Sequence, residues 1–386
     1  MRKVPWSSEI YDEMEVMPWG EREKYLNEKL TWVVKYAYEN ASSPRERFDE
    51  AGIHPDQIRT LNDLPKIPVL KKEQLRELQK ERPPFGGLEA LPLDKLSKVY
   101  VSPGPIYDPQ GPLGTQSFVQ TYPRTFYAAG IRRGDPTVIA FSYHALMPGH
   151  LFDAALTEIG GVVIPVGPGN TELQVKILHD LGVRAYVSNP SYLLTVIRKA
   201  EEMGYDFSRD FQLRVASFTG EMLPPSLREI YEQDYGINVT QHFGYSDIGG
   251  LAYECQEKSG MHIMPEAIVE VADPDGGDPL SPGEVGEIVT TTFNEAYPLI
   301  RIGSGDLGSY TDELCPCGRT NPRLVSIVGR IGDAFGVRGM FLHGEEAKSL
   351  ISRFPDIAEQ LKRRVQKISK DVLTFRCELR DESIDQ

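Results

Sequence analysis

The chain has 386 residues, 40% hydrophobic and 25% charged, an ordinary composition for a soluble globular protein with more than one domain. Its formal net charge of −14 argues against nucleic acid as a principal partner, because phosphate binding needs clustered Lys and Arg. No segment approaches the run of about 18 apolar residues that a membrane-spanning helix needs. The N-terminus has no signal-peptide core, so we expect a cytoplasmic protein.

The N-terminal part is predicted to be helical. Apolar residues recur at three-to-four spacing from Tyr25 to Ala37, which indicates amphipathic helices within residues 8–60. A short helix over 71–79 and a strand over 97–101 follow. Residues 102–112 are then predicted as an irregular loop where a phosphate-binding loop would lie. The prolines of this loop have no N–H group to donate, and the loop has no Lys, so it is predicted to bind phosphate weakly.

From 137 to 240, short apolar runs alternate with amphipathic helices. This rhythm predicts a parallel sheet covered by helices on both faces. Ligands of such sheets bind beyond the carboxyl ends of the strands, which places 219–221 and 242–247 at the expected site. The predicted strands cover 137–141, 161–166, 184–187, 213–218 and 237–240, and the predicted helices cover 150–159, 171–182, 191–203 and 224–235.

From 267 the units become shorter and turn-rich, which predicts a mostly antiparallel, β-rich subdomain over about 250–329. Within it, residues 301–306 are expected to form a tight glycine turn that ends on Asp306. Such a carboxylate can accept hydrogen bonds from a ribose diol, although a turn residue is the simpler interpretation of a lone Gly-Asp.

The fold class is therefore α/β, with a large N-terminal domain over 1–329 and a small, shortened α+β C-terminal lid domain over 330–386. In the lid domain, apolar and polar residues alternate over 331–342. Helices are expected over 344–354 and 356–365, and a strand over 372–379.

Three cysteines and one histidine are candidate metal ligands: Cys255, His262, Cys315 and Cys317. Three thiolates and an imidazole suit tetrahedral Zn²⁺, and four protein ligands leave no open position, so such a site is structural. The alternative is a set of buried thiols beside a surface histidine. Cys377 lies apart on a predicted strand and is expected in the core.

Several short motifs occur in an order that carries a family resemblance. They include Gly169–Gln174, Gly220-Glu221, Phe243–Asp247, Gly305-Asp306, Cys315–Thr320 and Gly329-Arg330. In these the chain resembles the adenylate-forming, AMP-binding superfamily, closest to its phenylacetate-CoA ligase branch, over nearly its whole length. The resemblance implies activation of a carboxylic acid by ATP, with Mg²⁺, followed by transfer of the acyl group to CoA. It also favours zinc, because this branch often keeps the Cys/His set.

The resemblance also implies roles for residues at the nucleoside. Asp306 matches the ribose-binding carboxylate, and Arg330 matches an arginine that reaches ribose and phosphate. Phe243 replaces the adenine-stacking tyrosine, within the segment Phe243-Gly244-Tyr245. Gly220 and Glu221 match the segment that lines the adenine pocket. The simpler alternatives are a core residue for Phe243 and a helix-dipole carboxylate for Glu221.

At the phosphates, Ser246 matches the hydroxyl that touches the α-phosphate, and Asp247 stands where the family has a glutamate for Mg²⁺. A turn-capping role is the alternative for Asp247. Three features depart from the family: the loop at 102–112, Gly332 at the hinge with only Asp333 nearby, and the absence of a Gly-Lys pair after 372–379. The loss of such donors is expected to slow adenylation, since one donor contributes about 10²–10³ in rate.

We expect an acid–CoA ligase on this basis. Two alternatives stay open: an AMP- or acyl-binding protein unable to form adenylate, and an adenylate-forming enzyme with another acceptor. The acid is expected to be aromatic or arylacetic, with core packing as the alternative for each pocket candidate: residues 142–144, 146–148, Tyr192 and Phe218. His144 or His242 could orient a carboxylate. A homodimer is the default expectation for the oligomeric state.

Overall fold

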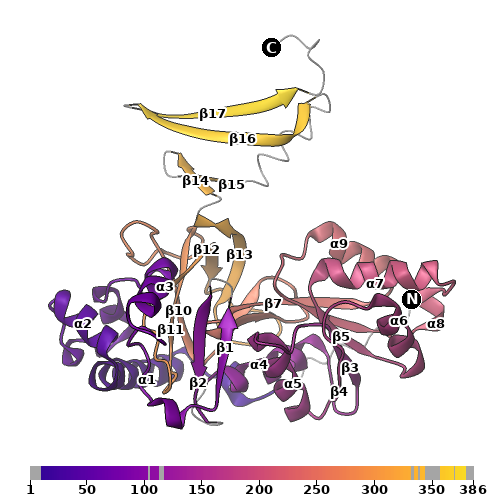
Figure 1. Ribbon diagram of the computed structural model, residues 1–386, viewed down its shortest axis with the longest axis horizontal. Coiled ribbons are helices and arrows are strands. Elements are labelled where there is room, and N and C mark those ends of the chain that lie inside the picture. Colours follow the sequence, from indigo (N-terminus) through magenta and orange to yellow (C-terminus); the bar gives the residue numbers. More distant parts are fainter. Residues whose placement is uncertain are drawn as a thin grey trace.

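The computed structural model describes residues 10–102, 105–112, 117–331, 334–337, 340–343, 357–368 and 370–379. One mixed sheet of 11 strands forms its centre, in the order β10-β11-β12-β13-β9-β8-β7-β6-β5-β3-β4 (Figure 1). No helix in the described ranges has both the length and the apolar character that a membrane span requires.

The strands at one end of this sheet run parallel, and helices connect them. These strands are β3 (Pro136–Ile139), β4 (Val162–Pro165), β5 (Ala185–Ser188), β6 (Val215–Phe218) and β7 (Asn238–Tyr245). The helices are α4 (Ser117–Ala129), α5 (Met147–Glu158), α6 (Thr171–Asp180), α7 (Pro190–Glu202), α8 (Phe207–Asp210) and α9 (Pro225–Glu229), and α9 continues as the π-helical turn Ile230–Asp234.

Helices cover both faces of the parallel strands, as predicted. Ile139 packs in one apolar cluster with Phe126 of α4 and Phe152 of α5. Its neighbour Val138 points to the other face and packs in a second cluster with Val175 of α6. Because both faces are buried, the strands consist of nearly unbroken apolar runs.

The antiparallel strands continue the same sheet, so the predicted β-rich region shares a sheet with the parallel half. Leu30 and Phe48 of the N-terminal helices pack against it, in a cluster with Ile268 and Phe293. The strands are β8 (Gly249–Glu254), β9 (Met261–Ile263), β10 (Ala267–Ala272), β11 (Gly286–Thr292), β12 (Ile302–Thr311) and β13 (Arg323–Arg330), and the packing helices are α1 (Trp19–Asn40) and α2 (Ser42–Glu50).

Helix α3 (Lys72–Glu81) begins beside β12. The backbone of Leu70, just before the helix, donates to the Arg301 carbonyl oxygen at 2.8 Å and accepts from the Gly303 amide at 2.9 Å. Leu75 of α3 is fully buried in the same cluster as Ile302 of β12. These contacts fix the first turn of α3 against the strand that carries Asp306.

Two predictions around the site are corrected by the structure. Residues 102–112 are not a loop throughout, because Ile106–Gln110 forms β2, which pairs with β1 (Lys98–Ser102). Residues 301–306 are not a free turn, because Ile302–Asp306 lies within β12. The strand predicted over 237–240 extends to Tyr245, so part of the 242–247 motif is in β7.

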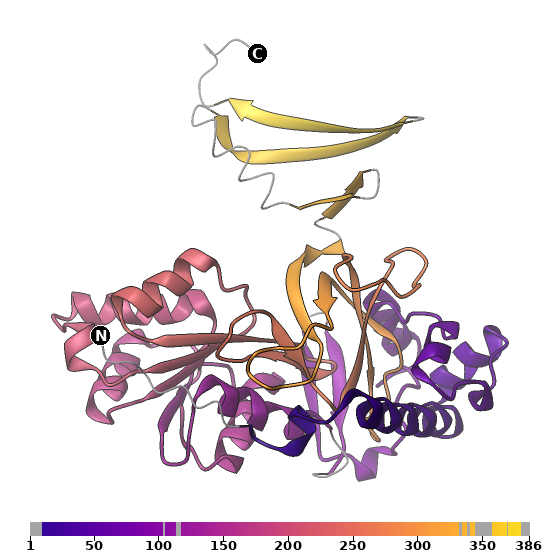
Figure 2. The same ribbon diagram turned by 180° about the vertical axis from the view of Figure 1, so that it is seen from behind.

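The chain after β13 contains two hairpins, which lie beyond the end of the large sheet (Figures 1 and 2). The first pairs β14 (Ala334–Val337) with β15 (Met340–His343), and the second pairs β16 (Ile357–Ile368) with β17 (Lys370–Leu379). The helix predicted over 356–365 is wrong, because these residues lie mainly in β16. The helix predicted over 344–354, and Gly332 and Asp333, lie outside the described residues.

Candidate active site

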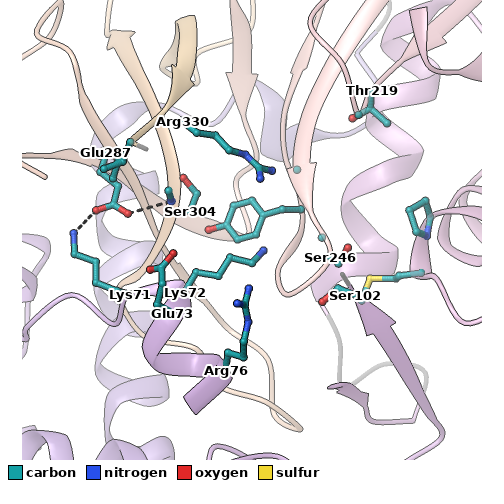
Figure 3. A pocket seen from close by; sticks show the side chains of 18 of the residues that line it. Lys71, Lys72, Glu73, Arg76, Ser102, Thr219, Ser246, Glu287, Ser304 and Arg330 are labelled. Atoms are coloured by element: carbon teal, nitrogen blue, oxygen red, sulfur yellow. Dashed lines mark hydrogen bonds and ion pairs between the residues drawn. The ribbon is translucent and has the colours of Figure 1, made fainter. Parts of the chain in front are cut away.

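A cleft of about 970 Å³ lies where the carboxyl ends of the parallel strands meet the antiparallel half of the sheet. Phe141 follows β3 and Gly220 follows β6, while Tyr245 ends β7, and all three line this cleft. The first turns of α3 line its opposite wall (Figure 3). This is the position that the parallel-sheet rule predicts for a ligand.

Asp306 and Arg330 come together beside this cleft: Arg330 lines it, as do Ser304 and Gly305, the residues just before Asp306. They are register partners on β12 and β13, and Arg330 Nε lies 3.3 Å from Asp306 Oδ1. The Asp306 side chain is 17% exposed and the Arg330 side chain 76%. Burial raises the pKa of Asp306 above its ordinary value, and the Arg330 guanidinium opposes that shift. Because the Arg330 partner is exposed, the ion pair contributes only about 0–1 kcal/mol to stability, and the guanidinium can turn to a ligand at little cost.

A bulge in β12 presents Asp306. The pairing of β12 with β11 shifts register between Glu287 and Val289, and Gly305 lies in this bulge with φ 75°. The Gly305 amide donates to Glu287 Oε1 at 3.1 Å, while Lys71 Nζ contacts Glu287 Oε2 at 2.5 Å. The Glu287 side chain is only 2% exposed. A buried ion pair thus fixes the backbone next to Asp306, and the turn predicted from the sequence is a bulge within a strand.

Asp247 lies in a buried position beside α3. Its side chain is 0% exposed, Lys72 Nζ lies 2.7 Å from Oδ2, and Ser102 Oγ donates to Oδ1 at 3.4 Å. Asp108 is buried next to it, and burial together with the Asp247 carboxylate raises the pKa of Asp108 well above its ordinary value. The predicted Mg²⁺ ligand is therefore already paired with an ammonium group.

Of the two residues Gly220 and Glu221 that were assigned to the adenine pocket, only Gly220 lines the cleft. Gly220 lines the cleft with φ 81°, and a Cβ there would come within 2.7 Å of the Asn189 amide nitrogen. Glu221 is exposed and accepts a hydrogen bond from Ser191 Oγ at 2.7 Å.

Within the β7 motif, Gly244, Tyr245 and Ser246 line the cleft. Phe243 is not among the lining residues; it packs against two apolar clusters, with its ring 6.2 Å from that of Tyr245. The structure therefore places Tyr245, rather than Phe243, against the cleft. The stacking role predicted for Phe243 has no support from this arrangement.

Apolar side chains line one end of the cleft, namely Tyr122, Phe141, Met147, Pro148, Leu151 and Phe152. Of the residues predicted for an acid pocket, Met147 and Pro148 line this end of the cleft. Tyr192 instead hydrogen-bonds with the backbone of Gly169, and Phe218 is fully buried in the core on the other face of the sheet.

His242 lies behind this apolar end. It is buried among the rings of Tyr122, Phe126 and Phe152, with Nδ1 3.1 Å from Ser217 Oγ. Burial lowers the pKa of His242 to about 3, so its imidazole is neutral. His144 is exposed and does not line the cleft. Neither imidazole is placed to hold a carboxylate.

The four predicted metal ligands meet in one buried cluster. The ligand atoms of Cys255, His262, Cys315 and Cys317 all lie within 4.8 Å of one another. Cys255 Sγ is 3.7 Å from Cys315 Sγ, and Cys317 Sγ is 3.4 Å from His262 Nε2. His262 Nδ1 lies 3.3 Å from the Asn321 carbonyl oxygen, an arrangement that directs Nε2 toward the thiols as in metal-binding histidines. The donor set and its burial fit a structural Zn²⁺.

The sequence motifs do not include the charged residues that α3, its N-terminal neighbour and β11 bring to the cleft: Lys71, Lys72, Arg76 and Glu287. Lys72 and Arg76 are four residues apart and so share one face of the helix. That spacing was visible in the sequence, but the position of the helix beside β12 depends on long-range contacts.

Comparison with known proteins places the chain among adenylate-forming enzymes. A model described as "AMP-binding enzyme" matches residues 116–294. Phenylacetate-coenzyme A ligase of Aromatoleum evansii is 34% identical, over 92% of this chain and 81% of that protein. Phenylacetate-coenzyme A ligase of Thermus thermophilus is 32% identical, over 89% of this chain and 78% of that protein.

A solved structure of 2-hydroxyisobutyryl-CoA ligase, in an open conformation with 2-HIB-AMP and CoA, agrees in fold. It superposes with a TM-score of 0.88 at 28% identity, over 98% of this chain and 85% of that chain. The predicted fold class and the predicted acid–CoA ligase are confirmed by these relatives, which do not favour the alternative of a protein that only binds AMP. The chain belongs to the AMP-binding enzymes, in their phenylacetate-CoA ligase branch.

Proposed function

We propose that the chain activates an aromatic or arylacetic acid with ATP and transfers the acyl group to CoA. A carboxylate oxygen attacks the α-phosphorus, the bond to the β-phosphate breaks, and pyrophosphate leaves. The CoA thiolate then attacks the acyl carbon, and AMP leaves. The meeting of Asp306 with Arg330, a lining residue of a partly apolar cleft, carries this proposal.

At the nucleoside, Asp306 accepts hydrogen bonds from the ribose hydroxyls, and the Arg330 guanidinium binds ribose and phosphate oxygens. The exposure of Arg330 supports this role, because its pairing with Asp306 can yield to a ligand at little cost. Gly220, Glu221 and the segment Phe243-Gly244-Tyr245 are proposed around the adenine. Tyr245 is best placed of these aromatic rings, since it lines the cleft.

At the α-phosphate, Ser246 is the proposed hydroxyl donor and Asp247 the proposed carboxylate ligand of Mg²⁺. A bound Mg²⁺ would offset phosphate charge. Lys72 Nζ lies 2.7 Å from Oδ2 of Asp247, and Oδ1 accepts a long hydrogen bond from Ser102. Asp247 is therefore proposed to bind Mg²⁺ with one oxygen and Lys72 with the other.

The apolar end of the cleft supports an aromatic acid. The rings of Tyr122, Phe141 and Phe152 border it, and flat rings pack well against such edges. The relatives named phenylacetate-coenzyme A ligase agree with this substrate class, whereas the structural relative is named for a small hydroxy acid.

We further propose a structural Zn²⁺ at Cys255, His262, Cys315 and Cys317. It would join the end of β8 and strand β9 to the connection between β12 and β13, the two strands that carry Asp306 and Arg330. A domain boundary at 329/330 is proposed because β13 is the last strand of the large sheet in chain order and ends at Arg330. A cytoplasmic location and a homodimer stay predictions.

Pyrophosphate release with a panel of acids tests the proposed function. The purified chain is incubated with ATP, Mg²⁺ and CoA, and with phenylacetate, benzoate or 2-hydroxyisobutyrate. We expect pyrophosphate and an acyl-CoA with an aromatic acid, and much less with the hydroxy acid. Tight AMP binding without pyrophosphate release from any acid would instead show a binding protein.

A further inference from the structure

Among the residues that the structure describes, Arg76 is a cation of the cleft without a partner. Of the four cationic residues that line the cleft, Lys71 pairs with Glu287, Lys72 with Asp247 and Arg330 with Asp306. Arg76 has no hydrogen bond or ion pair within the described part of the chain, and its Nε is buried without an acceptor. A buried N–H group without a partner is costly, which indicates that Arg76 is placed for an anion that binds in the cleft.

The position of Arg76 relative to the nucleoside residues is suitable for the far end of a nucleotide. Lys72 and Arg76 project from α3 toward the open space that Arg330 faces from the opposite side (Figure 3). Lys72 Nζ lies 5.4 Å from the centre of the Tyr245 ring, the aromatic residue next to Ser246. Three carboxylates also line the cleft: Glu73 and Asp275 are exposed to solvent, and Glu287 is paired with Lys71.

The hairpin that follows α3 supplies little for phosphate binding. Of its described residues, 98–102 and 105–110, only Ser102 lines the cleft. Asp108 of the same hairpin is buried and would repel phosphate if it were charged. The cationic groups on this wall therefore come from α3 and not from β1–β2.

Resting on the proposed function, we propose that Arg76, with Lys72 one turn before it, binds the β- and γ-phosphates of ATP. Arg76 is a binding residue for the group that leaves as pyrophosphate when the acid attacks the α-phosphorus. A guanidinium stays charged at every working pH and can donate two parallel hydrogen bonds to phosphate. The leaving group gains charge as its bond to the α-phosphorus breaks, so this contact is expected to stabilise the transition state as well.

Binding measurements with ATP, pyrophosphate and AMP test this proposal on the full chain. For Arg76→Ala we expect the affinities for ATP and pyrophosphate to fall about ten- to a hundredfold, with the AMP affinity unchanged. Arg76→Lys is expected to recover part of the loss, because it keeps the charge without the paired donors. Arg82→Ala is the matched control, since Arg82 directly follows α3 and pairs with Glu46 outside the cleft.

Two results would overturn the proposal. One is an ATP affinity of Arg76→Ala equal to that of the wild type. The other is an equal loss of ATP and AMP affinity in both Arg76→Ala and Arg76→Lys with unchanged thermal unfolding. The proposed function is checked separately, by acyl-CoA formation in the wild type. A wild-type chain that forms acyl-CoA while Arg76→Ala keeps full ATP affinity would contradict only the role of Arg76.

Discussion

Asp306 and Arg330 are register partners on neighbouring antiparallel strands, and their side chains meet at 3.3 Å beside the cleft. Twenty-three residues lie between them in the chain, including the connection that carries Cys315 and Cys317. Their meeting therefore depends on the register of β12 against β13. The Cys/His cluster includes two residues of that connection, and the bulge at Gly305, in the pairing of β12 with β11, presents Asp306.

The bulge gives a first prediction, on Glu287. Glu287→Ala removes the acceptor of the Gly305 amide and the partner of Lys71, so Asp306 is held less firmly. We expect the AMP affinity to fall about tenfold, which corresponds to about 1.4 kcal/mol. Glu287→Gln keeps an acceptor for Gly305 and is expected to lose less. Isothermal titration with AMP measures both, with the exposed Glu28→Ala as control; unchanged AMP binding in Glu287→Ala would show that the bulge needs no such support.

The Cys/His cluster gives a second prediction. The purified chain is expected to hold about one zinc ion, and Cys317→Ser is expected to lose it. The loss of a structural metal belongs to the large destabilisations, of about 4 kcal/mol or more. Metal analysis and thermal unfolding of the same samples measure this. Cys377→Ser, a cysteine of β17, is the control. A zinc-free wild-type protein with the same unfolding midpoint would rule out a structural metal.

His242 gives a prediction on pH. Burial lowers its pKa to about 3, whereas the unfolded chain titrates near 6.5, so the unfolded state binds more protons between these values. The free energy of unfolding therefore decreases as the pH falls through this window. The slope of the unfolding free energy against pH reports how many more protons the unfolded state binds. In His242→Gln this number is expected to fall by about one. Urea unfolding across the window measures the slope, with the exposed His144→Gln as control. Identical slopes in the wild type and His242→Gln would mean that the native imidazole is charged.

Asp108 gives a prediction of the opposite sign. Its pKa is raised in the folded state by burial and by Asp247, so the folded state binds more protons than the unfolded one above the ordinary Asp pKa. The native fold therefore loses stability as the pH rises toward the raised pKa. Asp108→Asn removes this ionisation and is expected to be at least as stable as the wild type, with the advantage larger at about pH 8 than at about pH 5. The exposed Asp94→Asn is the control.

Urea unfolding at these two pH values tests whether Asp108 is protonated in the native protein. A variant Asp108→Asn that is less stable than the wild type, and more so at the higher pH, would show that the carboxyl is ionised in the native protein. Its stabilising partner would then be the Lys72 ammonium beside Asp247.

Local patterns predicted the parallel half well, because each strand is a short apolar run bounded by an amphipathic helix. They failed where the partner is distant. Residues 357–368 have Ile357, Leu361 and Val365 at helical spacing, yet they pair with β17 in a hairpin. Short apolar patterns fit either structure, and tertiary pairing decides between them.

At the site, too, local motifs were predictive and long-range contacts were not. The motifs around Asp306, Arg330 and the metal ligands identified residues that the fold brings together. The partners of these residues could not be found from local sequence. Glu287 reaches Lys71 across 216 positions, and Lys72 reaches Asp247 only because Leu70 pairs with β12. Phe243 and Tyr245 are both aromatic, so the motif alone could not show which ring lines the cleft.

AMP binding by Asp306→Ala, measured by isothermal titration against the wild type, tests the central claim most directly. The loss of a carboxylate that accepts ribose hydroxyls is expected to weaken AMP binding about ten- to a hundredfold. Unfolding should change little, because the partner of Asp306, Arg330, is 76% exposed and such a pair contributes little to stability. A variant that binds AMP as tightly as the wild type would contradict the placement of the nucleoside at Asp306 and Arg330.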